Sequence, residues 1–332
     1  MWILKNSKDL LDAMQSQTRK KFSCLKTFDF STLYTTIPHD KLREKLHSLI
    51  NRAFVSRKGV RRYHYITIFN GCGQFAKADS KSRQKYSETE ICELLDFLID
   101  NIYVKFGDKL FRQITGIPMG TNCAPLLADL FLFAYESEFL TTLVRSKKVH
   151  IAKKFNLSFR YIDDLISFNN SKINEYLHLI YPAELVIKET TETLASVSYL
   201  DLCIEIQSDG KLSSKLYDKR DDFNFPIVNF PVMSSNIPAS PAYGVYISQL
   251  LRYLRACTCY CNFQERHGLL ASKLFNQGFT VTGLIRSFKK FYGRQSEVIT
   301  KYDTSPVTMM RDAIPYYDLF MEFSCLLSHY CD

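Results

Sequence analysis

The sequence lacks an apolar run long enough to cross a membrane, and it lacks the cysteine spacing of a metal site. Its longest apolar stretch, residues 124–135, is interrupted by Asp129, whereas a membrane-spanning helix needs about 18 consecutive apolar residues. The apolar stretch at the N-terminus is too short for a signal peptide. The 10 cysteines are scattered and include no Cys-x-x-Cys pair, which argues against a zinc site. We therefore expect an intracellular protein, nuclear or cytoplasmic, with reduced thiols and no membrane partner.

Composition and charge narrow the class further. The 332 residues are 46% hydrophobic and 23% charged, which is typical of a globular chain. Forty-three Lys and Arg exceed 34 Asp and Glu, so the formal net charge is +9. The excess is concentrated in two windows, 51–86 and 252–294, and the rest of the chain is net acidic. Basic segments of this kind favour an acidic partner, with nucleic acid the first candidate.

Hydrophobic periodicity predicts an α+β body followed by a helical region. Residues 31–37 are expected to form a loop, and 51–86 a loop or loosely ordered insertion. Thr121 or Asn122 is expected to cap the helix that begins near Pro125. One helical face is expected to run from Ile247 to Cys261. The expected helices are 1–20, 38–50, 89–102 and 125–140, the expected strand is 25–30, and the expected hairpins are 104–111, 159–168 and 200–217.

Three carboxylates stand out by position. Asp29 ends a buried strand, and Asp163 and Asp164 are adjacent within an apolar hairpin. Acids that converge at strand ends need a compensating charge, and a hard divalent cation fits oxygen ligands. Two such ions form a clamp for phosphoryl transfer. The alternative from the acids alone is structural, because Asp-Asp is an ordinary turn pair and Asp29 could cap the next helix.

Three motifs surround these acids in a fixed order. They are FDFSTLY at 28–34, QITGIPMGTNCAP at 113–125 and RYIDD at 160–164. This order resembles the palm of reverse transcriptases. The longer segments around these motifs resemble the Penelope-like group of retroelement reverse transcriptases. They include DFSTLYTTIPH, GIPMGTNCAPLLADLF and YLDLCIEI, and the resemblance extends from about Trp2 to Asp312.

The resemblance implies an RNA-directed DNA polymerase core that transfers nucleotides from dNTP to a primer 3′-OH. It implies two Mg²⁺ ions, with Mn²⁺ as a substitute, and an RNA template and DNA primer as partners. The implied fold is an α+β right-hand palm, with an antiparallel sheet and helices on one face, followed by a helical thumb. The expected domains are 1–235, a palm with remnant fingers and a basic insertion at 51–86, and 236–332, the thumb. No oligomeric state is indicated.

The resemblance also assigns roles to the first motif and to the acids. Asp29 and Asp163 would be metal ligands, with Asp164 as an accessory acid. Phe30 would offer its backbone carbonyl to the second metal. Tyr34 would lie under the incoming sugar and exclude a 2′-hydroxyl by its bulk, its alternative being a half-buried aromatic.

The second motif would contact the substrate. Gly116, Pro118 and Gly120 would let the backbone approach the templating pair closely. Met119 stands where retroviral-type sequences have Gln, so its contact would be apolar. Lys188 occupies the region where polymerases hold a lysine near the leaving pyrophosphate, although a surface lysine on a strand edge is the alternative.

The basic residues would hold the nucleic-acid backbone. Their alternative is the solvated face of an ordinary helix or turn, and His39 is expected to be merely exposed. The candidate nucleic-acid-binding residues are Arg61, Arg62, Lys215, Lys219, Arg220, Arg252, Arg255, Lys289, Lys290 and Arg294.

Two other function classes compete with an active polymerase. Relatives of this kind have a fingers region before the Asp29 strand and often carry a C-terminal GIY-YIG endonuclease. We therefore expect a piece of a longer element, and a truncated, inactive nucleic-acid-binding remnant is the alternative function. A two-metal nuclease ranks last, because the sequence supplies no extra His or acid that would position a water. Tyr34 discriminates the two classes, because a nuclease has no use for a sugar gate, that is, a side chain that excludes a 2′-hydroxyl.

Overall fold

The computed structural model describes residues 2–17, 19–56, 59–77, 84–223, 225, 227–295 and 297–322. The chain divides into two compact units, one of Met1–Lys5 and Cys24–Thr191 and the other of Asn6–Ser23 and Glu192–Asp332. This division falls earlier than the domain break expected at residue 235. The reason is that the strands after 191 bond to the helices that follow: the Ser214 hydroxyl donates to the Ala256 carbonyl at 2.7 Å, and the Ser214 N–H donates to the Thr258 hydroxyl at 3.0 Å.

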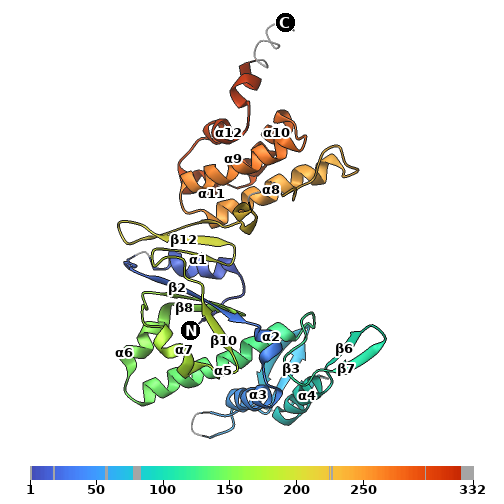
Figure 1. Ribbon diagram of the computed structural model, residues 1–332, viewed down its shortest axis with the longest axis vertical. Coiled ribbons are helices and arrows are strands. Elements are labelled where there is room, and N and C mark those ends of the chain that lie inside the picture. The colour runs from blue at the N-terminus through green and yellow to red at the C-terminus, as the bar shows by residue number, and fades with distance from the viewer. Residues whose placement is uncertain are drawn as a thin grey trace. The chain divides into compact units, whose positions relative to one another are not determined.

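The first unit is built on a five-stranded sheet, shown in the lower half of Figure 1. Strand β1 runs parallel to β8, and every other neighbouring pair is antiparallel. Four of the strands, with α5 and α7, form the succession β2–α5–β8–β9–α7–β10, a β-α-β-β-α-β unit of the ferredoxin-like type. In spatial order the strands are β1 (Trp2–Ile3), β8 (Ser158–Tyr161), β9 (Asp164–Phe168), β2 (Leu25–Ser31) and β10 (Val186–Glu189).

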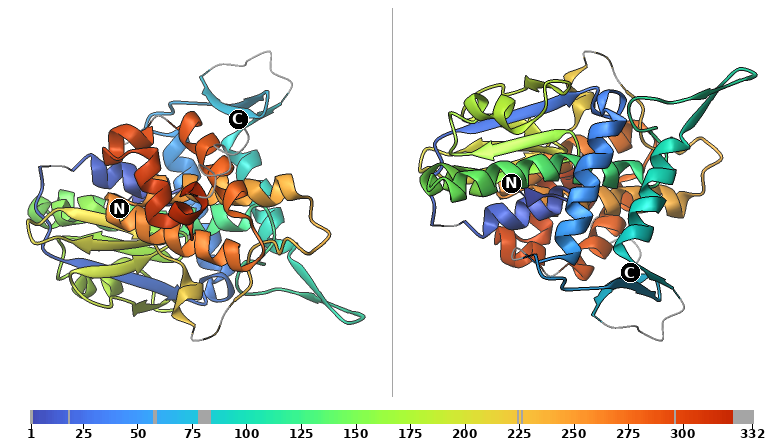
Figure 2. Two further views of the ribbon diagram at one scale, coloured as in Figure 1. Left: turned by 90° about the horizontal axis from the view of Figure 1, so that it is seen from above. Right: turned by 90° about the horizontal axis from the view of Figure 1, so that it is seen from below.

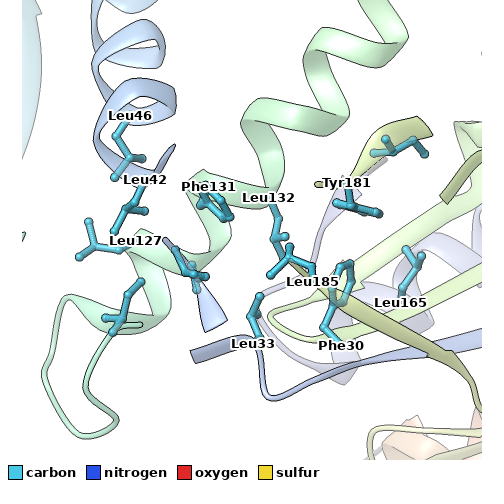
Figure 3. Packing of buried hydrophobic residues seen from close by; sticks show 14 of the residues in the cluster. Phe30, Leu33, Leu42, Leu46, Leu127, Phe131, Leu132, Leu165, Tyr181 and Leu185 are labelled. Carbon is cyan, nitrogen blue, oxygen red and sulfur yellow. The ribbon is translucent and has the colours of Figure 1, made fainter. Parts of the chain in front are cut away.

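Helices cover one face of this sheet. In Figure 2 (right), α3 crosses α5 and lies beside α4. Helix α5 is apolar on several sides in its N-terminal half, where Ala124, Leu127, Ala128, Phe131 and Leu132 are buried. Figure 3 shows Phe131 and Leu132 of α5 between Leu42 of α3 and Phe30 of the sheet. The helices of this unit are α2 (Leu33–Thr36), α3 (His39–Phe54), α4 (Glu88–Asp100), α5 (Ala124–Arg145), α6 (Val149–Ala152), the 3₁₀ helix η1 (Lys153–Leu157) and α7 (Asn174–Ile180).

The prediction of a loosely ordered insertion at 51–86 is wrong where the structure describes it. A three-stranded sheet forms from β3 (Tyr65–Phe69), β4 (Cys72–Ala76) and β5 (Lys85–Tyr86), in the order β4-β3-β5. The turn between β3 and β4 is Asn70-Gly71, with φ of 48° and 74°. Asn-Gly between apolar runs is a strong hairpin signal. The prediction of a loop gave more weight to the many basic residues of this window than to this turn. Four basic residues of this window, Arg57, Lys58, Lys81 and Arg83, lie outside the described residues.

Three smaller expectations also need correction. Residues 31–37 contain the one-turn helix α2, because Thr32 adopts a left-handed φ of 60° that ends β2. The N-cap of α5 is Cys123 rather than Thr121 or Asn122. Residues 1–20 begin with strand β1 before the helix α1 (Ser7–Gln15). The expected hairpin at 104–111 is confirmed as β6 (Tyr103–Phe106) and β7 (Lys109–Arg112).

The second unit combines α1 and a three-stranded antiparallel sheet with a group of helices. The expected face from Ile247 to Cys261 is split, because α8 ends at Ala256 and α9 begins at Tyr260. Its other elements are β11 (Ser196–Tyr199), β12 (Leu202–Ile206), β13 (Leu212–Leu216), η2 (Lys219–Asp222), α8 (Ala239–Ala256), α9 (Tyr260–Asn276), α10 (Val281–Arg294), α11 (Glu297–Tyr302) and α12 (Pro306–Ala313).

The predicted fold class is confirmed: an α+β body with a mainly antiparallel sheet, helices on one face of it, and helices after it. Within the described residues, no helix has the length and apolar character needed to cross a bilayer.

Candidate active site

The register of strands β2 and β9 brings the three predicted acids together. Asp29 lies directly opposite Asp164 in this antiparallel pair, and opposed residues share one face of a sheet. Asp163 lies in the two-residue turn that joins β8 to β9, and its carbonyl accepts from the Phe30 N–H at 3.0 Å. The next opposed pair, Phe28 with Leu165, belongs to the core under the helices. The acids therefore occupy the face of the sheet opposite to that core.

This face carries a row of polar side chains across four strands. Lys188 of β10 lies opposite Asp29, and Tyr161 of β8 lies opposite Asp164. The row thus reads Lys188, Asp29, Asp164, Tyr161. It places a cation beside the acids at the β10 end. Lys188 is exposed, and its expected role near a leaving pyrophosphate stays a prediction.

The acids perturb one another. Burial, followed by the charges of Asp163 and Asp29, raises the pKa of Asp164 to about 6. The pKa of Asp163 is also raised, chiefly by burial, with Asp29 adding to the effect. Partly buried like charges are costly, and a bound cation offsets that cost.

The donor set fits magnesium better than a metal with a complete protein cage. Within the described part of the chain, no group of three or more His, Cys, Asp or Glu side chains meets the geometry of a metal site. Mg²⁺ is usually bound through one or two carboxylates, with waters and substrate phosphates completing its shell. The Asp29 and Asp163 carboxylates and the Phe30 backbone carbonyl would supply a set of this size. The Phe30 ring is buried against Tyr181, with ring centroids 4.8 Å apart, so the ring itself is not available to a ligand.

Tyr34 lies close enough to the acids to feel their charge. It is the second residue of α2, the helix that begins directly after the left-handed Thr32. Burial, and then the charges of Asp163 and Asp129, raise the pKa of Tyr34 above its ordinary value. The charge of Asp163 therefore reaches Tyr34, and the role expected for this side chain at the sugar stays a prediction.

The loop at 116–120 is joined to the segment that carries Tyr34. The Gly116 N–H donates to the Ile37 carbonyl at 2.8 Å, and the Ile117 N–H donates to the Tyr34 carbonyl at 2.6 Å. Gly116 has a φ of +83°, and a Cβ there would lie 2.4 Å from the Tyr34 carbonyl oxygen. This close approach is within the protein, which explains the glycine without reference to a template.

His39 was expected to be merely exposed, and this is wrong. It is half-buried, and its Nε2 lies 2.7 Å from the Gly116 carbonyl oxygen. The ring fixes the same loop from the start of α3. Further along the loop, Pro118 is half-buried, Met119 is 72% exposed and Gly120 has a φ of +99°.

Several of the candidate nucleic-acid-binding residues are engaged by acids. Arg61 pairs with Glu88 at 2.7 Å and Arg252 with Asp201 at 3.0 Å. Arg220 pairs with Asp218 at 2.7 Å, and Lys215 lies 3.6 Å from Glu265. These partners favour the structural alternative for the four cations. The remaining candidates are all exposed: Arg62, Lys219, Arg255, Lys289, Lys290 and Arg294.

Comparisons with known proteins return distant likenesses only. No family model matches the chain, and no curated protein matches it. Telomerase from Candida albicans, in complex with a fragment of telomeric RNA, is 15% identical with a TM-score of 0.46, over 94% of this chain and 48% of that one. Apo telomerase from Candida tropicalis is 11% identical with a TM-score of 0.44, over 94% and 49%. The Sicinivirus 3Dpol RNA-dependent RNA polymerase is 12% identical with a TM-score of 0.45, over 82% and 50%.

The chain therefore spans about half the length of the solved structures that it matches. The sheet topology and the row of acids, rather than these likenesses, carry the functional argument below.

Proposed function

We propose that this chain is the core of an RNA-directed DNA polymerase of a Penelope-like retroelement. The observation that carries the proposal is the register that sets Asp29 opposite Asp164, with Asp163 in the adjoining turn. Acids in this arrangement suit two-metal nucleotidyl transfer. The proposed partners are an RNA template, a DNA primer and dNTPs.

The chain's own residues would divide the work as follows. Asp29, Asp163 and the Phe30 carbonyl would hold Mg²⁺, with Asp164 beside them. When bound, the ions would activate the primer 3′-OH and stabilise charge on the leaving group. Tyr34 would exclude a 2′-hydroxyl from the sugar position. Lys188 would attract the leaving pyrophosphate from its position opposite Asp29.

The remaining assignments belong to the same proposal. The loop of Gly116, Pro118, Met119 and Gly120 would contact the templating pair. We assign the palm to 1–235 and the thumb to 236–332, where exposed cations such as Lys289 would follow a duplex backbone.

The test is primer extension on an RNA template with the full chain, dNTPs and Mg²⁺. Asp163→Asn should abolish extension, because it removes a ligand charge while keeping the side chain's shape. Asp108→Asn, an exposed substitution in the β6–β7 turn, is the matched control and should leave extension intact. Extension that survives Asp163→Asn would contradict the site. Binding that falls steeply with salt, without any extension, would indicate the inactive remnant instead.

A further inference from the structure

The most deeply buried charge of the first unit lies directly beneath the acidic turn. Arg160 of β8 is fully buried, and it is the largest of the fully buried side chains. Its Nε donates to Glu136 Oε1 at 2.6 Å, and its Nη1 donates to Asp129 Oδ1 at 2.7 Å. Its Nη2 donates to the Asp129 carbonyl at 3.1 Å. Both acids belong to α5, so the guanidinium ties the sheet to that helix.

The same guanidinium also bonds the turn. Arg160 Nη1 donates to the Ile162 carbonyl at 2.9 Å. Ile162 has a φ of 51°, a left-handed conformation that is strained for a β-branched residue. Such a conformation persists only where its surroundings fix it. Ile162 immediately precedes Asp163, so the position of its carbonyl sets the direction in which the acid leaves the turn.

We propose that Arg160 is a positioning residue, which holds the Ile162 carbonyl so that Asp163 and Asp164 face the metal position. This inference rests on the proposed function. The Asp129 carboxylate accepts from the same Nη1 that donates to the Ile162 carbonyl, and Asp129 lies in the helix that follows the 116–120 loop. The acidic turn and the start of α5 therefore take their relative position from one side chain.

Stability alone does not account for this arrangement. Buried ion pairs can often be replaced by apolar residues without loss of stability. Apolar residues in place of Arg160, Glu136 and Asp129 together would fill the space without an unpaired charge, but they could not donate to the Ile162 carbonyl. A lysine would keep the charge, but it lacks the planar fork that serves Glu136, Asp129 and the turn at once.

The first measurement is Mn²⁺ binding to the full chain without nucleic acid. Binding is detected as the loss of the electron paramagnetic resonance signal of the free ion. Asp163→Asn identifies the site. Arg160→Lys should weaken Mn²⁺ affinity about tenfold, the effect typical of groups that orient a metal ligand. Asp129→Ala, which leaves Arg160 paired with Glu136, should weaken it less, and it covers the case in which the Arg160 variant fails to fold.

The second measurement does not depend on a metal. The Phe30 N–H donates to the Asp163 carbonyl, so its hydrogen exchange reports the position of the turn. Arg160→Lys should accelerate exchange at Phe30. The matched control is Ser158→Ala, which removes the buried 2.7 Å contact with Ser167 at the other end of the same hairpin. This control should lower the unfolding midpoint, yet leave both Mn²⁺ affinity and Phe30 exchange unchanged.

The outcomes separate the two proposals. If Asp163-dependent Mn²⁺ binding and Phe30 exchange are the same in Arg160→Lys as in the unsubstituted chain, Arg160 has no positioning role and the proposed function stands. If the unsubstituted chain shows no Asp163-dependent Mn²⁺ binding, the metal site of the proposed function fails, and faster Phe30 exchange in Arg160→Lys alone would then reduce Arg160 to a support of the hairpin.

Discussion

The backbone N–H of Ile117 donates to the carbonyl oxygen of Tyr34 at 2.6 Å. This bond joins the loop at 116–120 to the helix turn that carries the proposed sugar gate. Together with the His39 contact to Gly116, it makes the two segments one structural element. A change in the loop is therefore expected to move Tyr34 as well.

Gly116→Ala should be strongly destabilising. A Cβ at Gly116 would lie 2.4 Å from the Tyr34 carbonyl oxygen, which is backbone and cannot move aside cheaply. We expect a decrease of more than about 2 kcal/mol in the free energy of unfolding, measured by urea titration. Gly120→Ala is the matched control, because Gly120 has a similar φ of +99° but no described atom within 4 Å of an added Cβ. Equal decreases at both positions would show that backbone strain alone is responsible.

Tyr34→Ala should reduce the preference for dNTP over rNTP. Removing the ring opens the space that a 2′-hydroxyl would occupy, so rNTP incorporation should rise by at least about tenfold, or about 1.4 kcal/mol less discrimination. Tyr34→Phe keeps the ring and should keep the preference. The measurement is the ratio of kcat/KM for the two nucleotides, and an unchanged ratio in Tyr34→Ala would remove Tyr34 from the sugar site.

The acids should destabilise the chain when no metal is present. The pKa of Asp164 is about 6 in the folded chain, above the ordinary 3.8. Between these values the folded state binds more protons than the unfolded state, so stability falls as pH rises through about 4 to 6. Asp164→Asn should therefore be more stable than the unsubstituted chain at about pH 8 in the presence of a chelator. Added Mg²⁺ should reduce the difference in unfolding temperature between the two chains. Thermal unfolding with and without Mg²⁺ checks both points.

The second unit should be sensitive to acid through one histidine. Burial lowers the pKa of His267 to about 3, and its Nε2 lies 2.5 Å from the Tyr246 hydroxyl. The unfolded state binds a proton below about pH 6.5 while the folded state does not, so stability is lost as pH falls from about 6.5 toward 3. The slope should approach about 1.4 kcal/mol per pH unit. His267→Gln should reduce this slope in urea titrations, whereas a change at the exposed His150 should not.

Exposed cations on α10 should set the salt dependence of nucleic-acid binding. Lys289 and Lys290 are both exposed on that helix. Replacing both with alanine should lower the slope of log affinity against log salt by about one for each phosphate that a lysine no longer neutralises. The control is Lys211→Ala, since Lys211 pairs with Asp209 at 3.1 Å. A slope that falls equally in the control would argue against a thumb surface on α10.

The acids could be predicted because the information is local. An apolar strand that ends in Asp29 and an apolar hairpin around Asp163 and Asp164 each place acids at a strand end. The resemblance to reverse transcriptases implied that these acids share one site. The register that makes Lys188 the neighbour of Asp29 could not be predicted, because β10 is short and only partly apolar. Its pairing is decided by contacts distant in sequence.

The partners of Arg160 were missed for a similar reason. Asp129 and Glu136 are seven residues apart, two helical turns, and so share one face of α5. Two acids on one face need a cation partner if that face is buried, and the apolar residues around Asp129 indicate burial. The sequence did not identify Arg160 as this cation, because its position against α5 is set by the pairing of β8 within the sheet. The Asn70-Gly71 hairpin was likewise predictable, but the surrounding charge favoured a loop.

The second unit is made of two segments that are far apart in the sequence, and this affects the order in which the chain can fold during synthesis. Its helix α1 precedes the whole of Cys24–Thr191, yet it belongs with the residues after 191. The Phe22 N–H, for example, donates to the Gly210 carbonyl at 2.8 Å. As the chain leaves the ribosome, α1 cannot pack into its own unit until residues beyond 191 have been synthesised. Until then, Leu10 and Leu11, which are buried in the folded chain, lack that packing. The first unit can acquire its fold during that interval, so the order of translation favours completion of the acidic sheet before the helical unit closes around its own N-terminal segment.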